Sequence, residues 1–529
     1  MIRCLPSFAA DCSHQDDSES KETANILGET WFYSKSSRIQ TGRTMKKTYS
    51  ITRRRFMKGA SAAALTLPLH RITQAAEPAG PHQATGTRVG EVTDNSAIVW
   101  TRLTKHATRN NDGVLFDKKI DKQNPQPVTV AVEEIEGACP GAPGRVWLRY
   151  GLNPDLSVGA KVKWIDVTAA TDHIHQFLLD GLKPNSTYHY VSQATGHDGR
   201  TVRSEVRGKF FTAPAATTPS EFRFCVMTCQ GYQDRDHPDG HPIYPSMLAL
   251  EPKFVTLTGD LVYYDSNEPR AVSPALARLH WERMFSLPRL VEMMRNASSY
   301  WLKDDHDTLS DDSWPGMKAG ELTFAEGQKI FRQQAPIGNQ SYRTFRWGRD
   351  LQIWFTDGRD FRSPNKLPDG PDKTIWGAEQ KAWFKRTVLE SNATWKVLIS
   401  PTPLVGPDRA NKNDNHSNAG FAHEGDELRE WLKANVPDNF FVVCGDRHWQ
   451  YHSVHPTAGT QEFSVGAASD SHAGGTPGEN KLYHRFHRVK GGFLSVELRT
   501  EGQNSVIAFQ LRDVAGAIGY EAVYRRAVS

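Results

Sequence analysis

The sequence has no run of 18 or more consecutive apolar residues, and it therefore predicts no transmembrane span. Cysteine is scarce, with 6 among 529 residues, which excludes a disulfide framework. Lysine runs, basic helices, internal repeats and low-complexity tracts are also missing, so no nucleic-acid specificity is expected. The chain does contain 38% hydrophobic and 10% aromatic residues, too many for a disordered protein, and its length predicts about two to four domains.

The N-terminal part has the pattern of an export signal. A basic cluster over 52–58 precedes a short, weakly apolar stretch over 59–69 that ends near small residues. The paired arginines before Phe56 resemble the twin-arginine signal, an address that directs folded proteins to the twin-arginine export machinery. An amphipathic helix with a basic start is the alternative. Met45 lies a normal distance upstream, so we interpret residues 1–44 as an over-long start.

The charge balance changes when this leader is set aside. The chain has 64 Lys+Arg and 60 Asp+Glu, a net charge of +4. Residues 1–75 hold 12 of these basic and 6 of these acidic side chains, which leaves 52 basic against 54 acidic residues, a net charge of −2. Any attraction for an anionic ligand must therefore come from bound metals or a few arginines. We expect residues 1–76 to be the leader of a periplasmic or secreted protein.

Residues 77–213 predict an all-β domain. Short strand-like runs occur at Ser96–Trp100, Val128–Val132, Arg145–Tyr150 and Tyr188–Ser192. The segment Leu182-Lys-Pro-Asn-Ser-Thr-Tyr188 is similar to the tyrosine corner of fibronectin type III-like sandwiches, in which the tyrosine hydroxyl caps a nearby backbone group. No residue of this region indicates catalysis.

After a Pro/Thr-rich linker over 212–220, residues 221–529 alternate strand-like runs with helical patterns, which predicts an α/β domain. Residues 312–345 carry no pattern that can be assigned. The predicted helices are Ala271–Arg295, Ala378–Leu389 and Gly425–Ala434. The predicted strands are Phe222–Met227, Phe254–Thr258, Leu351–Thr356, Trp395–Ser400, Phe440–Cys444, Gly492–Leu498 and Ser505–Leu511.

Four strand-like runs lead directly into side chains that can bind metals. Because function gathers at the carboxyl ends of strands in α/β sheets, these positions are the candidate site. A single Gly-Asp pair is usually a turn, and a lone histidine is usually a satisfied polar residue, but four such strand ends together indicate more than turns. The side chains concerned are Cys229, Asp260, Tyr263, Asp304, Asp305, His306, Asp446 and His448.

The mixture of groups indicates which ions the site would take. Carboxylate, imidazole, phenolate and thiolate together favour a hard ion such as Fe(III), with carboxylate-rich space beside it for Ca²⁺, Mg²⁺ or Mn²⁺. Phenolate and thiolate ligands must be deprotonated, and only a strongly charged metal makes that favourable near neutral pH. Two close cations that share a carboxylate form a clamp for in-line phosphoryl transfer. A histidine outside the metal sites, such as His306, can protonate a leaving oxygen.

The ordered motifs resemble the alkaline phosphatase D family of metallophosphoesterases. Gly-Asp-x-x-Tyr, Trp-x-x-Asp-Asp-His and Gly-Asp-x-His follow one another in the family's order, and Asp357-Gly-Arg359-Asp-Phe-Arg362 is similar to its Asp-x-Arg-x-x-Arg segment. Residues 376–383 and 395–404 resemble its later blocks. The likeness covers nearly everything from residue 45 onward. It implies a metallophosphoesterase-type αββα sandwich (α/β or α+β class), preceded by a fibronectin III/Ig-like all-β sandwich.

Carried over residue by residue, the resemblance implies a dinuclear centre. Asp260 would bridge the two metals. Cys229, Tyr263 and His448 would complete an Fe(III) site, and Asp304, Asp305 and Asp446 would face a calcium-like site. His306 would lie beside the phosphate as acid and base. Arg359 and Arg362 would clamp substrate oxygens, because a guanidinium matches phosphate in a bidentate fork, with a structural salt bridge as the alternative.

The sequence departs from the family pattern at several positions. Tyr264 stands where the family usually has glutamate, and Asp311 where asparagine is common. Lys303 falls inside the Trp-to-Asp spacing and is expected to point to solvent. A polar loop over 405–424 either lines the substrate entrance or is an ordinary solvated loop.

Cys225 and Cys444 have similar positions in two strands that we expect to be neighbours. Buried free thiols are favoured over a disulfide between them.

Three hypotheses for function follow. The main one is a secreted metal-dependent phosphatase that hydrolyses phosphate esters by in-line attack at a dinuclear Fe/Ca-type centre. The second keeps the site but changes the substrate to a phosphodiester, a phospholipid head group or a sulfate ester. The third is a non-catalytic cell-surface binding protein with a decayed site. Decay is expected to remove ligands, and the predicted ligands are all present, which favours an enzyme.

Overall fold

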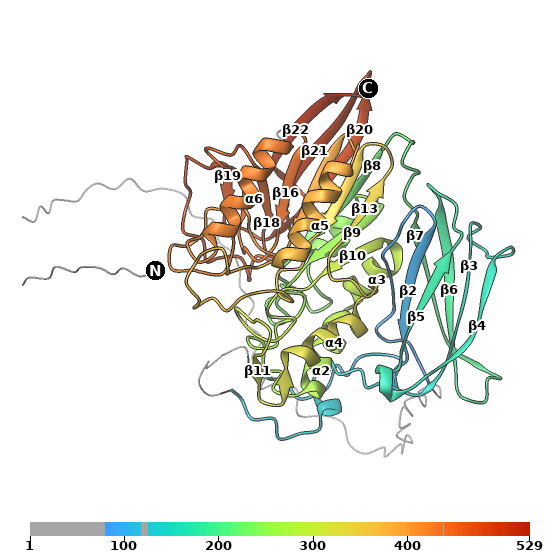
Figure 1. Ribbon diagram of the computed structural model, residues 1–529. Coiled ribbons are helices and arrows are strands. Elements are labelled where there is room, and N and C mark those ends of the chain that lie inside the picture. Colours follow the sequence, from blue (N-terminus) through green and yellow to red (C-terminus); the bar gives the residue numbers. More distant parts are fainter. Residues whose placement is uncertain (1–79, 118–124, 437, 529) are drawn as a thin grey trace, which may run out of the picture. The chain divides into compact units, whose positions relative to one another are not determined.

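Two large mixed β-sheets, packed face to face, form the frame of the protein (Figure 1). The computed structural model describes residues 80–117, 125–436 and 438–528. The predicted leader, residues 1–76, lies outside these described residues, and the export signal stays a prediction.

The first sheet has nine strands, in the order β22-β21-β20-β8-β9-β10-β1-β2-β5. Its central strands β8, β9 and β10 run parallel and are almost entirely buried, which is why they are near-continuous apolar runs rather than alternating ones. In sheet order the strands are Ile518–Ala527, Asn504–Asp513, Gly492–Glu501, Phe222–Met227, Phe254–Thr258, Ser298–Leu302, Thr87–Gly90, Ser96–Arg102 and Ile174–Asp180.

The second sheet has seven strands, in the order β13-β14-β15-β16-β18-β17-β19. Strands β14, β15, β16 and β18 run parallel, and β13, β17 and β19 are antiparallel to their neighbours. In sheet order the strands are Arg343–Trp347, Leu351–Phe355, Trp395–Ser400, Phe440–Cys444, Gln461–Val465, Gln450–Val454 and His484–Arg488.

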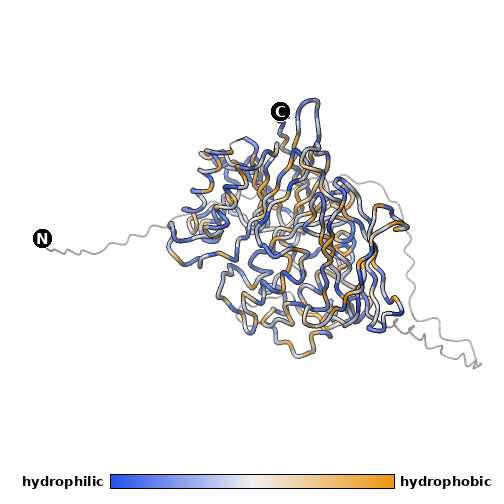
Figure 2. Tube along the Cα trace, turned by 45° about the vertical axis from the view of Figure 1, so that its right-hand side comes forward, coloured by the Kyte–Doolittle hydropathy of each residue, from blue (hydrophilic) through white to orange (hydrophobic). Residues whose placement is uncertain are grey.

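Helices cover the outer face of each sheet. Helices α1 to α4 share an apolar core with β8, β9 and β10, and helices α5 and α6 share another with β14, β15 and β16. A third core fills the space between the sheets. Figure 2 shows many hydrophobic residues in the middle of the described part of the protein. The helices are Ile243–Leu248, Pro274–Phe285, Pro288–Asn296, Phe324–Gln334, Gly377–Glu390 and Ala422–Asn435, and a small hairpin consists of β11 (Lys318–Ala319) and β12 (Leu322–Thr323).

The N-terminal described region is all-β, as predicted. A four-stranded sheet, β4-β3-β6-β7, packs through its own apolar core against β1, β2 and β5. The predicted corner contact is confirmed, because the Tyr188 hydroxyl accepts a hydrogen bond from the Lys183 backbone N–H at 2.9 Å. The four strands are Ala160–Val167, Gly144–Gly151, Thr187–Thr195 and Val202–Phe211, and two short 3-10 helices, η1 and η2, span Val132–Glu134 and Ala169–Thr171.

The first large sheet runs across the predicted domain boundary. Strand β1 pairs in parallel with β10, in the register Val89 with Ser298 and Gly90 with Ser299. The Ser299 hydroxyl also donates to the Val89 carbonyl at 2.6 Å. The N-terminal region therefore contributes β1, β2 and β5 to the sheet that carries the candidate site. The division at residues 213–221 stays a prediction.

Two sequence predictions of elements are wrong. Residues 128–131 form no strand, and η1 begins at Val132; the valines of this segment instead pack singly against the helical core. The single helix expected over 271–295 is two helices, because Pro288 has no backbone N–H to continue the first and begins the second.

A buried charge cluster connects the N-terminal region to α2. Arg102 donates through Nη2 to Asp172 Oδ1 at 3.0 Å and to Glu282 Oε1 at 2.8 Å. The other oxygen of Glu282 accepts the Cys139 backbone N–H at 2.9 Å. One guanidinium thus lies between two carboxylates in a nearly dry interface. Burial raises the pKa of Glu282 to about 7; the Arg102 charge opposes this shift and Asp172 adds to it.

Replacement of Glu282 by glutamine is expected to change how stability depends on pH. Because the pKa of Glu282 in the folded protein lies above the ordinary glutamate value of 4.5, the stabilisation is complete below pH 4.5 and is lost as the pH rises to about 7. Wild type should lose about 3 kcal/mol of unfolding free energy relative to Glu282→Gln over this range. Urea unfolding of both proteins measures the difference, and parallel pH profiles would contradict it.

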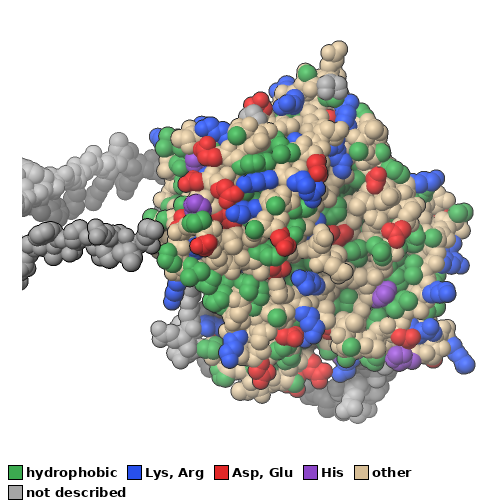
Figure 3. Space-filling view, in the orientation of Figure 1, with side chains coloured by type: hydrophobic (Ala, Val, Ile, Leu, Met, Phe, Trp, Pro, Cys, Tyr) green, Lys and Arg blue, Asp and Glu red, His purple; other side chains and the backbone are tan. Residues whose placement is uncertain are grey.

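One face of the molecule carries charges of both signs: Figure 3 shows Lys and Arg interspersed with Asp and Glu over the face in view. In the described part of the chain, no helix is both long and apolar enough to cross a bilayer.

Candidate metal centre

The carboxyl ends of β8, β9, β10 and β16 bring the predicted ligands together. Cys229, Asp260 and Asp446 each follow one of these strands with a left-handed backbone, at φ angles of 51°, 56° and 62°. A non-glycine residue in this conformation costs on the order of 1–3 kcal/mol. Three such residues at adjoining strand ends indicate that the fold accepts backbone strain in order to place these three side chains.

The two Gly-Asp pairs are explained by the closeness of the strand ends. A Cβ atom on Gly259, which has a φ of +92°, would lie 2.5 Å from the Asp304 Cβ. A Cβ atom on Gly445 would lie 2.6 Å from the Thr258 carbonyl oxygen and 2.7 Å from the Thr228 hydroxyl. Because both contacts are too short for any larger residue, glycine lets Asp260 and Asp446 approach one another from different sheets.

One half of the centre contains the soft and phenolic groups. Asp260 Oδ2 lies 3.4 Å from Cys229 Sγ and 3.2 Å from Tyr263 Oη. Tyr263 Oη is also 3.3 Å from His448 Nε2. Ligand atoms of Cys229, Asp260 and His448 all lie within 4.8 Å of one another. These four side chains therefore lie close enough together to surround a single ion, and their role as its ligands stays a prediction.

The other half contains carboxylates. Ligand atoms of Asp260, Asp304 and Asp446 lie within 4.8 Å of one another, and so do those of Asp260, Asp305 and His306. Asp260 belongs to all three groups, which is the arrangement expected of a bridging ligand.

Two carboxylate oxygens of this set are buried without a hydrogen-bond partner among the described residues. They are Asp260 Oδ1 and Asp304 Oδ2. A buried acceptor left unpaired costs about 1–3 kcal/mol, and more when it is charged, and a cation removes this cost. The donor set and these two oxygens therefore fit a pair of metal ions.

The electrostatics of the isolated chain point to the same conclusion. Burial raises the pKa of Asp260 well above its usual range; His306 opposes this shift, while Asp305 and Asp304 add to it. Burial, together with the charge of Asp260, also raises the pKa values of the Cys229 thiol and the Tyr263 phenol. Without cations the interior disfavours these anions, and a multivalent cation reverses that preference.

The two predicted arginines are buried and differ in their contacts. Arg359, 1% exposed, donates through Nε to Asp304 Oδ1 at 2.5 Å and pairs through Nη2 with Asp305 Oδ2 at 3.3 Å. This is the salt-bridge alternative named above. Arg362 donates to Asn365 Oδ1 and to the Asp414 carbonyl, both at 2.6 Å, while its Nε and Nη1 have no partner among the described residues. A substrate-clamping role for either stays a prediction.

His306 lies at the rim of the carboxylate half. Its Nδ1 is 2.6 Å from Asp265 Oδ1, a residue that the sequence analysis did not select. Burial alone lowers the pKa of His306, but the charges of Asp265, Asp305 and Asp260 outweigh it and raise the pKa well above its usual value. A histidine held protonated in this way can donate a proton.

Two further residues were missed or left without a role. His472 Nε2 lies 2.9 Å from Tyr263 Oη, and its Nδ1 lies 3.0 Å from Asp234 Oδ2. Asp307 accepts the Leu261 and Asp304 backbone N–H groups, at 3.0 and 2.7 Å, and so connects two ligand-bearing loops. The sequence feature that could have indicated His472 is a further apolar strand, β18, which is followed by a polar segment.

The departures from the family pattern have separate explanations. Tyr264 points into the helical core, where the Trp281 indole donates to its hydroxyl at 2.6 Å.

Lys303 does not point to solvent: it is 6% exposed and pairs with Asp357 and, at 2.8 Å, with Asp360 Oδ1. The expectation was wrong because two buried carboxylates hold its ammonium group inside. Asp311 is half-exposed at the rim, with its Oδ1 3.5 Å from Lys412 Nζ.

The polar loop over 405–424 packs beside the centre. Arg447 lies between two of its carboxylates, 3.0 Å from Asp408 Oδ2 and 3.2 Å from Asp414 Oδ2, and also contacts Asp446. Lys412 of the loop reaches Asp311 at the rim. The loop therefore borders the carboxylate half of the centre.

The expected neighbourhood of Cys225 and Cys444 is wrong, because they lie in β8 and β16, on different sheets and in different apolar clusters. Both are buried free thiols.

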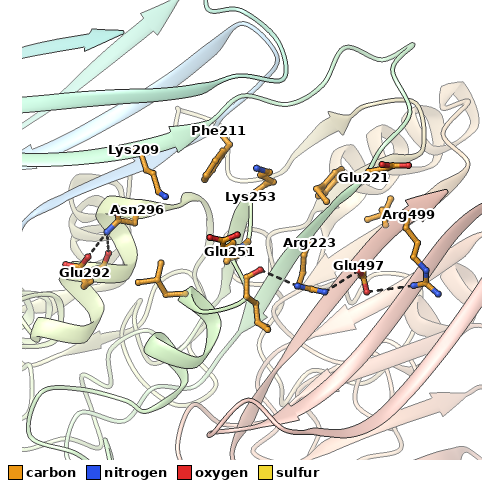
Figure 4. A pocket seen from close by; sticks show the side chains of 15 residues that line it. Lys209, Phe211, Glu221, Arg223, Glu251, Lys253, Glu292, Asn296, Glu497 and Arg499 are labelled. Atoms are coloured by element: carbon orange, nitrogen blue, oxygen red, sulfur yellow. Dashed lines mark hydrogen bonds and ion pairs between the residues drawn. The ribbon is translucent and has the colours of Figure 1, made fainter. Parts of the chain in front are cut away.

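An open cavity of about 790 Å³ lies at the starts of β8 and β9, away from the ligand-bearing strand ends (Figure 4). Basic and acidic side chains alternate along it; Arg223, for example, pairs with Glu497 Oε1 at 3.2 Å. None of the predicted site residues lines this cavity.

Two facing mixed sheets with outer helices, and metal-type ligands at their strand ends, define a metallophosphoesterase-like fold. The structure is similar to a solved structure described as PhoD, with a TM-score of 0.63 and 17% identity, covering 85% of this chain and 92% of that chain. It is also similar to the purple acid phosphatase PPD1 from yellow lupin (Lupinus luteus) seeds, with a TM-score of 0.56 and 14% identity, covering 83% and 73%. At these identities the likeness shows the fold alone.

Family models give the assignment. The model for PhoD-like phosphatase matches residues 224–490, and the model for the PhoD-like phosphatase N-terminal domain matches residues 70–214. The chain therefore belongs to the PhoD-like phosphatase family and is a phosphoric ester hydrolase. A comparison with curated protein sequences finds no match.

Proposed function

We propose that the protein is a secreted phosphatase that hydrolyses phosphate esters by in-line attack at a dinuclear centre of Fe/Ca type. One observation carries the proposal: Asp260 belongs to three of the four possible ligand groups among the described residues and has a buried oxygen that no described residue satisfies. A buried carboxylate left unpaired in this way is unfavourable, and bound cations held by Asp260 and its neighbours would compensate its charge.

The donor types support this choice of ions. Cys229, Tyr263, Asp260 and His448 suit Fe(III), and the carboxylates of Asp260, Asp304, Asp305 and Asp446 suit Ca²⁺, with Mg²⁺ or Mn²⁺ as substitutes. When bound, the metals polarise the phosphoryl group and neutralise charge that develops on its oxygens. Arg359 holds two of the carboxylates in place by ion pairs.

His306 supplies the proton for the leaving oxygen. Asp265 fixes the ring through Nδ1, at 2.6 Å, which leaves Nε2 turned toward the rim. Asp265, which lies outside the proposed ligand sets, pairs with the ring and favours its protonated form. The second candidate substrate class, phosphodiesters including phospholipid head groups, or sulfate esters, would use the same groups.

We also propose that residues 1–76 are a twin-arginine leader, that the mature protein is periplasmic or secreted, and that residues 77–213 form a fibronectin III-like sandwich. The basic cluster over 52–58 supports the first point. The Tyr188 corner contact supports the last.

Removal of metal is expected to abolish phosphate release from a chromogenic ester. Chelated protein should recover activity with iron and calcium together and much less with either ion alone, because each half of the centre has its own donor set. Metal analysis of the purified protein should find iron. Full activity in exhaustively chelated, metal-free protein would refute the proposal, and turnover of matched monoesters, diesters and sulfate esters distinguishes the substrate classes.

A further inference from the structure

We infer that His472 is a positioning residue of the metal centre, which holds the Tyr263 oxygen in place and is itself held by Asp234. The inference rests on the proposed function, because it concerns a residue that the proposal places beside iron. It adds a structural role for a loop that no motif of the sequence identified.

The geometry places His472 behind the phenol. Its Nε2 is 2.9 Å from Tyr263 Oη, closer than either Asp260 Oδ2 at 3.2 Å or His448 Nε2 at 3.3 Å. The two rings meet at 74° with centroids 5.0 Å apart. On its other side, Nδ1 is 3.0 Å from Asp234 Oδ2. Since a carboxylate only accepts, Nδ1 carries a proton and Nε2 is left for the phenol oxygen.

His472 is not itself placed as a ligand. Among the described residues, the ligand groups with atoms within 4.8 Å of one another include His448 and omit His472. Both of its ring nitrogens are already engaged, one by Tyr263 and one by Asp234. The arrangement is that of a carboxylate–histidine pair that orients a metal ligand from outside.

The loop that contains Asp234 is shaped to receive this histidine. A Cβ atom on Gly231 would lie 2.9 Å from His472 Nδ1, so any larger residue would push the ring away. Asp236 accepts the Asp470 backbone N–H at 2.7 Å, which ties the same loop to the segment that carries His472.

The N-terminal region anchors this loop from the other side. The Tyr232 hydroxyl donates to Glu136 Oε2 at 2.8 Å, and Arg109 contacts both side chains. Gln233 donates through Nε2 to the Phe116 carbonyl at 3.0 Å. The placement of Asp234, and through it of His472 and Tyr263, is therefore supported by residues before 140. This explains how an all-β region without catalytic residues can matter to the centre.

The hydrogen bond has a measurable electronic consequence. When Tyr263 serves as a phenolate, its phenol proton passes to His472 Nε2, and the ring, held at Nδ1 by Asp234, donates that proton back to Oη and so withdraws electron density from the oxygen. A phenolate bound to Fe(III) produces a charge-transfer absorption, whose energy falls when the oxygen becomes a stronger donor. Loss of the hydrogen bond should therefore move the absorption maximum to longer wavelength, an effect that a merely structural role would not produce.

The test compares iron-loaded full-length His472→Phe and Asp234→Asn with wild type. We expect a red-shifted maximum in His472→Phe, a smaller shift in Asp234→Asn, and a loss of about 10- to 100-fold in iron affinity or turnover. His452→Phe is the matched control: His452 is 3% exposed and bonds through both nitrogens, to Tyr520 at 2.9 Å and Gln461 at 3.1 Å, outside the centre. An unchanged maximum with wild-type affinity in His472→Phe would overturn the inference.

A wrong assignment of iron can be distinguished from a wrong role for His472. If wild type contains no iron and shows no charge-transfer band, the iron assignment is wrong whatever His472 does. The rate at which wild type and His472→Phe release their actual metal to a chelator then tests the inference. Faster release from His472→Phe, but not from His452→Phe, supports it, and equal rates overturn it.

Discussion

Replacement of Asp260 by asparagine is expected to lower phosphate ester turnover on the order of 10³-fold or more and to remove bound metal. Asparagine keeps the shape of the side chain but takes away the negative charge that three of the four possible ligand groups among the described residues have in common. Because burial and neighbouring acids raise the pKa of Asp260, the metal-free variant should unfold no more easily than metal-free wild type. Turnover, metal content and urea unfolding of both proteins provide the three measurements.

The three measurements together distinguish loss of the metal centre from loss of the folded structure. Asp350→Asn is a suitable control, because Asp350 is also 1% exposed and hydrogen-bonded but lies at the start of β14, outside the centre. It should retain metal and turnover. An Asp260→Asn protein with full activity and full metal content would show that the centre has been assigned to the wrong residues.

Replacement of Arg359 by methionine is expected to lower the free energy of unfolding by about 3–5 kcal/mol. The substitution keeps most of the length of the side chain and leaves Asp304 and Asp305 without the cation that contacts both. Retention of the calcium-type ion should fall as well, since its carboxylates lose their orientation. Denaturant unfolding and metal analysis measure the two effects.

Arg362→Met provides the comparison for this variant. Arg362 is equally buried, but its hydrogen bonds go to Asn365 and to a backbone carbonyl rather than to carboxylates of the centre. Its replacement should cost clearly less stability. If Arg359→Met instead keeps its stability and only raises KM, the residue clamps substrate, as the family resemblance implies.

Much of the centre could be predicted because its ligands stand at strand ends. A buried parallel strand is a short apolar run, and Cys229, Asp260 and Asp446 each follow such a run directly. Within the first sheet, the parallel strands β8 and β9 place their carboxyl ends together. Local sequence indicates these strand ends, but the meeting of β8 and β9 with β16 depends on how the two sheets pack.

The residues that were missed depend on contacts distant in the chain. His472 comes seven residues after β18, and its partner Asp234 lies in a loop after β8, so no short pattern connects them. The same holds for β1, whose partner β10 is some 200 residues away. Val128–Val132 shows the opposite failure: its residues favour a strand locally, but it pairs with no strand among the described residues.

The long-range pairing of the first sheet also sets the order in which the centre can be assembled. Strand β8 has β20 as a neighbour, and Val226 pairs with Leu494 only after nearly the whole chain has been synthesised. Contacts this distant in sequence form slowly. Cys229, at the end of β8, therefore reaches its final position in a finished polypeptide rather than in an emerging one. An export route for folded cargo, as proposed for the N-terminal leader, would suit a protein whose metal ligands come together this late.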